Sequence, residues 1–127
     1  ASELACKIYD LEIIKENIQT IKKNQTRFVI LQNIRPSENK NINKASLKFE
    51  LDHKRGSLAT ILNVLSDCKL NLTKIQSMPK IQTPWRYSFF VDVTFDNKEH
   101  YFKAKSIVEI MAKEFKVLGE YKNAKDD

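Results

Sequence analysis

The sequence predicts an α+β fold in which the elements follow the order βαββαβ, preceded by a short helix and two short strands. Two observations lead to this. Apolar and polar residues alternate in 47–51 and again in 87–95, and two other segments space their apolar residues as a helix does. With 127 residues, 42% of them hydrophobic and 30% charged, the chain has the composition of a folded domain. Its length fits one ordinary domain, or one small domain with a fragment of another.

The first 34 residues predict a helix followed by strands. Two apolar stretches, 11–14 and 27–32, have the length and composition of short strands. A helix over residues 1–9 is predicted because four residues take the spacing i, i+3, i+4 and i+7: Ala1, Leu4, Ala5 and Ile8. The sequence shows no capping residue ahead of this helix, so we expect the chain to begin inside an element of a longer protein.

A polar segment separates this stub from the rest of the chain. Residues 35–44 read RPSENKNINK, with one Pro, three Asn and a single large apolar residue. We assign residues 35–45 to a linker, 46–122 to one domain and 123–127 to a tail. The longer segment is the one of a size that folds alone.

The domain is predicted to begin with a half-buried strand at 47–51. The sequence HKRG at 53–56 turns the chain into a helix that Ser57 caps and that ends near residues 68–69. The apolar face of this helix consists of Leu58, Ile61, Leu62 and Leu65.

The second half of the domain repeats the pattern. A strand at 70–78 ends at Pro79, which cannot donate to a ladder and therefore marks a strand end or a sheet edge. The segment 86–95 is the strongest strand, residues 96–97 offer caps, and 116–122 supplies a last strand. Between them lies a long helix with one face formed by Ala104, Ile107, Val108, Met111 and Phe115. Four strands with both helices on one face make the ferredoxin-like architecture, which hosts many unrelated functions.

Charge does not indicate a nucleic-acid partner. The net charge is +6, but the lysines are spread over the whole length, with only short pairs such as Lys22-Lys23 and Lys54-Arg55. A binding footprint would concentrate them on one element. We interpret the charge as a solvated basic surface.

Metal centres, disulfides and membrane segments are not predicted either. Cys6 and Cys68 stand far apart without CxxC or Cys/His spacing, so we expect two buried or half-buried thiols and no metal or cofactor. No apolar run approaches the roughly 18 to 20 residues of a membrane span, and no secretory signal is visible. We expect a cytoplasmic protein without a membrane partner.

Three short motifs carry a resemblance to a known family. NLTKIQSMP at 71–79, followed by YSFFVDV at 87–93, resembles the ACT domain of prephenate dehydratases, where the motif reads NLTKIESRP. RGSLATIL at 55–62 resembles the Gly-Ala-Leu turn of the same domain. Residues 1–34 resemble the end of the catalytic domain of that family, with Thr26, Arg27 and Phe28 at its Thr-Arg-Phe motif.

The resemblance implies an L-phenylalanine site at a subunit interface. Backbone N–H groups at 56–58 are expected to bind the ligand carboxylate, and Asn71 the ammonium, while Leu58, Leu72 and Met78 help to line a pocket for the ring. Taken singly, each of these residues also has an ordinary role in a turn or core. The expected ligand-binding residues are Gly56, Ser57, Leu58, Asn71, Leu72, Thr73, Gln76, Ser77, Met78 and Pro79.

The chain departs from the family pattern at three of these positions. Ser57 stands for the Ala of the turn, Gln76 for the Glu of ESRP and Met78 for its Arg. The first change is mild because the backbone makes the expected contact there. The other two remove one charge of each sign together, which leaves phenylalanine binding possible and its affinity open.

The resemblance also implies a role for the first 34 residues. Prephenate dehydratases convert prephenate to phenylpyruvate, and Thr26 matches a catalytic threonine whose hydroxyl assists the departing oxygen. Arg27 could hold a substrate carboxylate or serve as a surface charge. One hydroxyl is not an active site, so we expect the parent protein to be the enzyme and these 127 residues alone to be inactive.

We therefore predict an allosteric phenylalanine-binding module that forms homodimers or higher homo-oligomers through its sheet. One alternative is a module for assembly alone, since open sheets have edges that can pair. The other is an RNA-binding domain with the same element order. Against that domain's RNP1 pattern, residues 86–93 match only at Arg86, Phe90 and Val91.

Overall fold

The computed structural model describes residues 2–23, 26–33, 41–52, 54–81, 83 and 86–124. The chain divides into two compact units, Ala1–Arg35 and Pro36–Asp127. Within the described residues, no helix is both long and apolar enough to cross a membrane.

Among the described residues of the first unit, the one helix is α1 (Glu3–Tyr9). The side chain of Ser2 caps it by accepting a hydrogen bond of 3.2 Å from the backbone N–H of Ala5. The expectation that the helix lacks a cap was therefore wrong, because Ser2 stands just before the first helical turn. No residue of α1 is buried.

The two strands predicted in this unit are absent from its described residues. Residues 11–14 and 27–32 are irregular, although both are rich in apolar residues. Four of these side chains are largely exposed, at 98% for Ile14, 88% for Phe28 and 89% for both Ile30 and Leu31. A strand needs a neighbour to accept and donate its ladder hydrogen bonds, and composition alone does not supply one.

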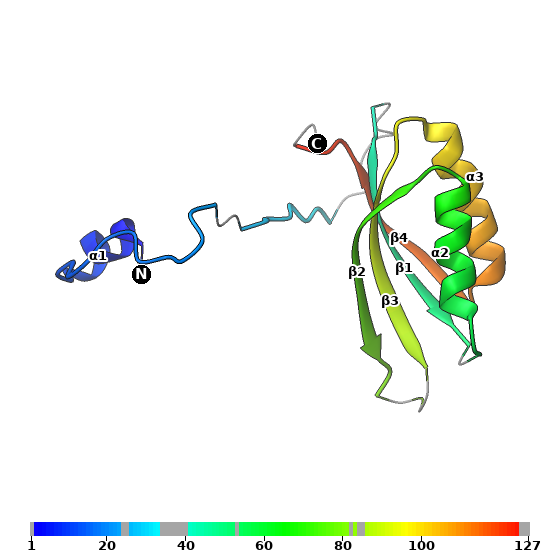
Figure 1. The fold of residues 1–127 in the computed structure, drawn as a ribbon, viewed down its shortest axis with the longest axis horizontal. Helices are drawn as coiled ribbons and strands as arrows, with labels where there is room; N and C mark the ends of the chain where they lie inside the picture. The colour runs from blue at the N-terminus through cyan, green and yellow to red at the C-terminus, as the bar shows by residue number, and fades with distance from the viewer. Residues whose placement is uncertain are drawn as a thin grey trace. The chain divides into compact units, whose positions relative to one another are not determined.

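The second unit is a four-stranded antiparallel sheet with two helices. Its elements follow the order β1 (Lys44–Leu51), α2 (Ser57–Asp67), β2 (Asn71–Pro79), β3 (Tyr87–Thr94), α3 (Lys98–Met111) and β4 (Glu114–Tyr121). The strands lie in the order β2-β3-β1-β4, and α2 and α3 both cover one face of the sheet (Figure 1). This is the predicted ferredoxin-like βαββαβ arrangement. Pro79 ends an edge strand, as its missing N–H required.

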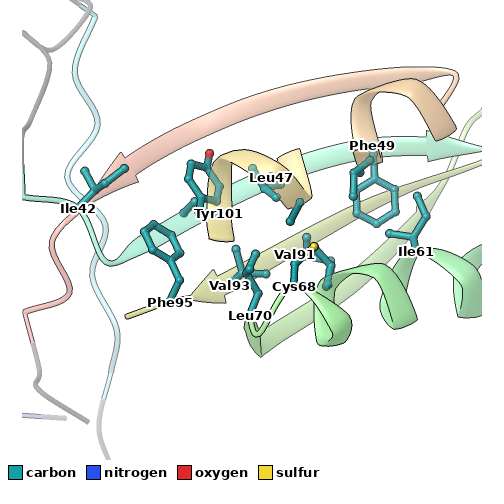
Figure 2. Packing of buried hydrophobic residues seen from close by; sticks show 14 of the residues in the cluster. Ile42, Leu47, Phe49, Ile61, Cys68, Leu70, Val91, Val93, Phe95 and Tyr101 are labelled. Carbon is teal, nitrogen blue, oxygen red and sulfur yellow. The ribbon is translucent and has the colours of Figure 1, made fainter. Parts of the chain in front are cut away.

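The core lies between the helices and one face of the sheet (Figure 2). Phe49 of β1, which is fully buried, stacks on Phe89 of β3 at 5.7 Å between ring centroids. Tyr101 of α3 is also fully buried and stacks on Phe95 at 4.6 Å. The alternation predicted for 87–95 is confirmed in its second half, where Val91, Val93 and Phe95 are buried.

Three local predictions about this unit were wrong. Strand β1 begins at Lys44, so the last two residues of the expected linker, 44 and 45, belong to the sheet and are buried. Phe115 lies in β4 rather than on the second helix, since α3 ends at Met111; its i+4 spacing from Met111 is a coincidence. Ser57 does not cap α2, because its hydroxyl donates to two carbonyl oxygens instead.

Asn97 does cap α3 as predicted, because its side chain accepts a hydrogen bond from the Glu99 N–H at 2.8 Å.

The face of the sheet away from the helices carries polar side chains. Glu50 of β1 is only 3% exposed, and the Ser88 hydroxyl of β3 donates to its carboxylate at 3.1 Å. The Ser46 hydroxyl of β1 donates to Asp92 of β3 at 2.6 Å. The polar face of the sheet is thus internally hydrogen-bonded.

Candidate functional site

A cavity lies between the N-terminal end of α2 and the end of the sheet where β1 finishes and β3 begins. Its volume is about 430 Å³, within the range of small-molecule sites. The turn from β1 to α2, the first turns of α2, and β3 contribute the lining residues: Leu51, Asp52, Lys54, Gly56, Ser57, Leu58, Ala59, Leu62, Tyr87 and Phe89. Apolar side chains dominate the wall, and the polar groups gather at the turn.

Gly56 gives this turn its shape. Its φ of 83° lies in the left-handed region, which glycine adopts at little cost. A Cβ built on Gly56 would meet nothing within 4 Å, so open space adjoins the backbone here. No side chain caps α2. The first hydrogen bond of the helix runs from the Thr60 N–H to the Gly56 carbonyl at 2.9 Å. The N–H groups of Leu58 and Ala59 therefore precede the hydrogen bonds of the helix. Such a helix start favours a carboxylate.

Ser57 and its neighbours hold the turn in place. The Ser57 hydroxyl donates to the carbonyl of Asp52 at 3.0 Å and to that of Lys54 at 2.8 Å. The Asp52 carboxylate forms an ion pair with Lys113, whose hydrogen bond holds the pKa of Asp52 below its ordinary value. The lining therefore combines donors for an anion, at Lys54 and the helix start, with one carboxylate.

The structure brings together some of the predicted ligand-binding residues. Gly56, Ser57 and Leu58 line the cavity. Ser77 and Pro79 pair in the sheet with Phe89 and Tyr87, two cavity residues, and so lie on the neighbouring strand at the same end of the sheet.

The other predicted residues lie elsewhere in the same chain. Asn71 pairs with Thr94, at the end of β3 opposite to the cavity, and Leu72 and Thr73 adjoin it. Met78 pairs with Ser88, whose hydroxyl contacts Glu50, and therefore belongs to the polar face away from the helices. Gln76 shares that face because strand residues two apart point the same way. The expectation that Leu72 and Met78 line one pocket with Leu58 fails within a single chain. Their part in ligand binding stays a prediction.

Several cavity residues were missed by the sequence reading. Tyr87, Phe89 and Leu51 were assigned to buried strand faces by their alternation. Leu62 was assigned to the apolar face of the helix by its spacing. The one available signal was position: Tyr87 begins its strand and is still 38% exposed, as a residue at the rim of a core would be.

The residues matched to the catalytic motif lie in the first unit. Thr26, Arg27 and Phe28 occupy irregular chain and are exposed. Their catalytic role stays a prediction.

Fold and cavity together define a class: a ferredoxin-like α+β domain with a small-molecule cavity at a helix N-terminus. Two solved structures share this fold. One, titled as a prephenate dehydratase from Arthrobacter aurescens in complex with L-Phe, has a TM-score of 0.61 and 24% identity, covering 71% of this chain and 31% of its own. The other, titled GqqA, a novel type of quorum quenching acylase, has a TM-score of 0.62 and 19% identity, covering 71% of this chain and 48% of its own. At such identities the likeness concerns the fold alone.

Sequence comparison identifies relatives of this chain. Residues 1–36 match the family described as prephenate dehydratase. A bifunctional chorismate mutase/prephenate dehydratase from Aquifex aeolicus is 36% identical over 128 residues, which cover 98% of this chain and 34% of that protein. The chain is thus related to the C-terminal region of prephenate dehydratases. It spans about a third of the length of this curated relative.

Proposed function

We propose that residues 46–122 form an ACT regulatory module that binds L-phenylalanine, within a protein that converts prephenate to phenylpyruvate. The observation that carries the proposal is the cavity of about 430 Å³ against the turn at 56–58, the segment that resembles the Gly-Ala-Leu turn. The L-Phe complex named for the Arthrobacter aurescens structure supports the same ligand.

The cavity lining offers a partner for each of the three groups of the ligand. The carboxylate would accept hydrogen bonds from the N–H groups of Leu58 and Ala59, with Lys54 as a nearby cation. The ring would pack on the apolar wall, which includes Leu62 and Phe89. The ammonium needs an acceptor, and Asp52 is the carboxylate within the cavity lining.

A second copy of the chain would complete the site. Strand β2 forms one edge of the sheet, and all its residues except Leu72 are exposed, including Ile75 at 44% and Met78 at 51%. Two such edges can pair antiparallel about a two-fold axis. This pairing would set Asn71 of the partner subunit beside the Pro79 end of β2, near the cavity, and would reunite the predicted ligand-binding residues across the interface.

Residues 1–34 would belong to the catalytic domain. Exposed apolar side chains of this unit, such as Phe28 and Ile30, would be buried if the unit packed against the rest of that domain. Thr26 would then assist the departing hydroxyl, and these 127 residues alone would produce no phenylpyruvate from prephenate. Measurable product from the purified chain would contradict this.

Neither alternative explains the cavity. RNA-recognition domains stack bases on aromatic residues of the open sheet face. Here Tyr87 and Phe89 alternate with Ser88 and so lie on the helix face, leaving Phe90 as the aromatic of β3 on the polar face. A module for assembly alone would use the β2 edge and would leave the cavity without a ligand.

Thermal unfolding with added L-phenylalanine tests the proposal. A ligand that binds only the folded state raises the melting temperature, by the equivalent of about 2.7 kcal/mol at a hundredfold excess over Kd. We expect a rise of several degrees with phenylalanine and smaller rises with tyrosine and tryptophan as controls. Absence of a shift at millimolar phenylalanine would favour the module for assembly alone.

A further inference from the structure

A buried carboxylate on the polar face of the sheet requires explanation. Glu50 lies in the central strand β1 and is 3% exposed, on the face of the sheet opposite to α2 and α3. Burial is the largest single influence and raises the pKa of Glu50, but the hydrogen bonds with Lys80, Glu114 and Ser88 and the charge of Lys80 together lower the pKa below the ordinary value of 4.5. A charge this buried persists only with well-placed partners.

The partners of Glu50 come from β1, from β3 and from Lys80, the residue after β2. Lys80 Nζ lies 2.7 Å from Glu50 Oε2, while Ser88 Oγ donates to Oε1 at 3.1 Å. Lys48 Nζ is farther away, at 3.6 Å, and Lys80 Nζ also lies 3.8 Å from Glu114 of β4. Lys80 is therefore the main cation.

The position of Lys80 in the chain links its pair with Glu50 to the end of β2. Lys80 directly follows Pro79, the end of edge strand β2, and its side chain reaches past β3 to β1. Its backbone N–H donates to the Arg86 carbonyl at 3.0 Å. Both its main chain and its side chain thus anchor the end of β2.

The anchored segment adjoins the cavity. Ser77 and Pro79 pair with Phe89 and Tyr87, two lining residues. Exposed side chains in 76–79 give this end of the edge strand little packing of its own. We propose that the Lys80–Glu50 pair is a positioning clamp that holds the 77–79 segment against β3 and so fixes one side of the candidate effector site. The effect on phenylalanine rests on the proposed function, whereas the clamp itself does not.

Two variants and a matched control test the clamp in the full chain. Lys80→Met removes the cation, Lys80→Arg keeps it, and Lys105→Met removes the cation of the 3.1 Å pair with Glu120, remote in sequence from the cavity lining. Should Lys80→Met fail to fold because Glu50 stays buried without its main cation, the double variant with Glu50→Gln replaces it.

The first measurement is amide hydrogen exchange. We expect Lys80→Met, or the double variant, to speed exchange severalfold in residues 77–89 and not in β4, with Lys80→Arg close to wild type and Lys105→Met unchanged in 77–89. Unchanged exchange in 77–89, or a uniform increase over the whole domain, would overturn the clamp, because a merely structural pair destabilises all elements alike.

The second measurement is the dissociation constant of L-phenylalanine by calorimetry. We expect Lys80→Met to raise it about 3- to 30-fold, the usual range for residues that act through a neighbour, with recovery in Lys80→Arg. An unchanged constant together with faster exchange would overturn the effector role of the clamp. Wild-type protein that binds no phenylalanine would overturn the proposed function, and hydrogen exchange would still decide the clamp.

Discussion

Both units of the chain contain large apolar side chains, but these are largely exposed in the first unit and form a buried core in the second. Residues 2–33 include Ile14, Phe28 and Ile30, each at least 88% exposed, whereas residues 41–124 bury Phe49 and Val93 completely. Helix α1 has no buried residue, while α2 and α3 each bury an apolar face against the sheet. The two units therefore differ in how much apolar surface they bury rather than in their apolar content. Apolar surface stabilises a fold only when it is removed from water.

The largest expected contrast compares one phenylalanine from each unit. Phe49→Ala removes a fully buried ring that stacks on Phe89, and should lower the free energy of unfolding by about 3–5 kcal/mol. Phe28→Ala removes a ring that is 88% exposed and should change it by less than about 0.5 kcal/mol. Urea denaturation followed by circular dichroism measures both, and equal losses would abolish the distinction between the units.

A smaller contrast lies within the second unit, between its two glycines. Gly56→Ala forces alanine to a φ of 83° and should cost about 1–2 kcal/mol. In Gly119→Ala, the new Cβ would meet Tyr121 at 3.5 Å, an ordinary contact, so the loss should be smaller. Denaturation midpoints of the two variants decide this. A larger loss of stability in Gly119→Ala than in Gly56→Ala would show that an added Cβ at position 56 does not strain the turn.

The helix caps extend the comparison to both units. Asn97→Ala removes the 2.8 Å cap of α3, whose buried face belongs to the core, and should cost about 1 kcal/mol of global stability. Ser2→Ala removes the 3.2 Å cap of α1, a seven-residue helix without buried residues. Isolated helices of this length are marginal, so we expect no change in the global transition. A loss after Ser2→Ala as large as that after Asn97→Ala would show that α1 supports the folded domain.

Acid should affect the second unit through Glu50. The folded-state pKa of Glu50 lies below its ordinary value of 4.5, so the carboxylate contributes stability above that pH and loses it as pH falls through the folded-state pKa. Glu50→Gln should therefore flatten the decline in melting temperature between about pH 5 and pH 3. Glu109→Gln, at an exposed site on α3, is the control. An equally steep decline in Glu50→Gln and wild type would remove Glu50 from the acid response.

The sequence predicted the second unit better than the first for a physical reason. Periodicity locates 47–51 and 87–95 because one face of each strand meets the core, and this local pattern survives in the fold. Strand β2 is almost entirely exposed, and its end was predicted from Pro79 instead. The strands expected at 11–14 and 27–32 required neighbours that apolar composition cannot reveal.

The candidate site was predictable only in part. A glycine before a helical pattern indicates the turn at Gly56, but Tyr87 and Phe89 join the cavity through pairing and packing, which no short motif encodes. The sheet register separates Asn71 from Gly56 by the length of β3, a distance that the order of motifs along the chain did not disclose.

Chemical-shift mapping of L-phenylalanine on the nitrogen-15-labelled chain tests the central claim most directly, because it locates the ligand as well as detecting it. We predict that the largest shifts occur at the amides of Gly56, Ser57 and Leu58, with smaller ones at Tyr87 and Phe89, and that the amides of 26–28 do not respond. Saturable shifts confined to residues 2–33, or no shifts at millimolar phenylalanine, would contradict an effector site at the start of α2.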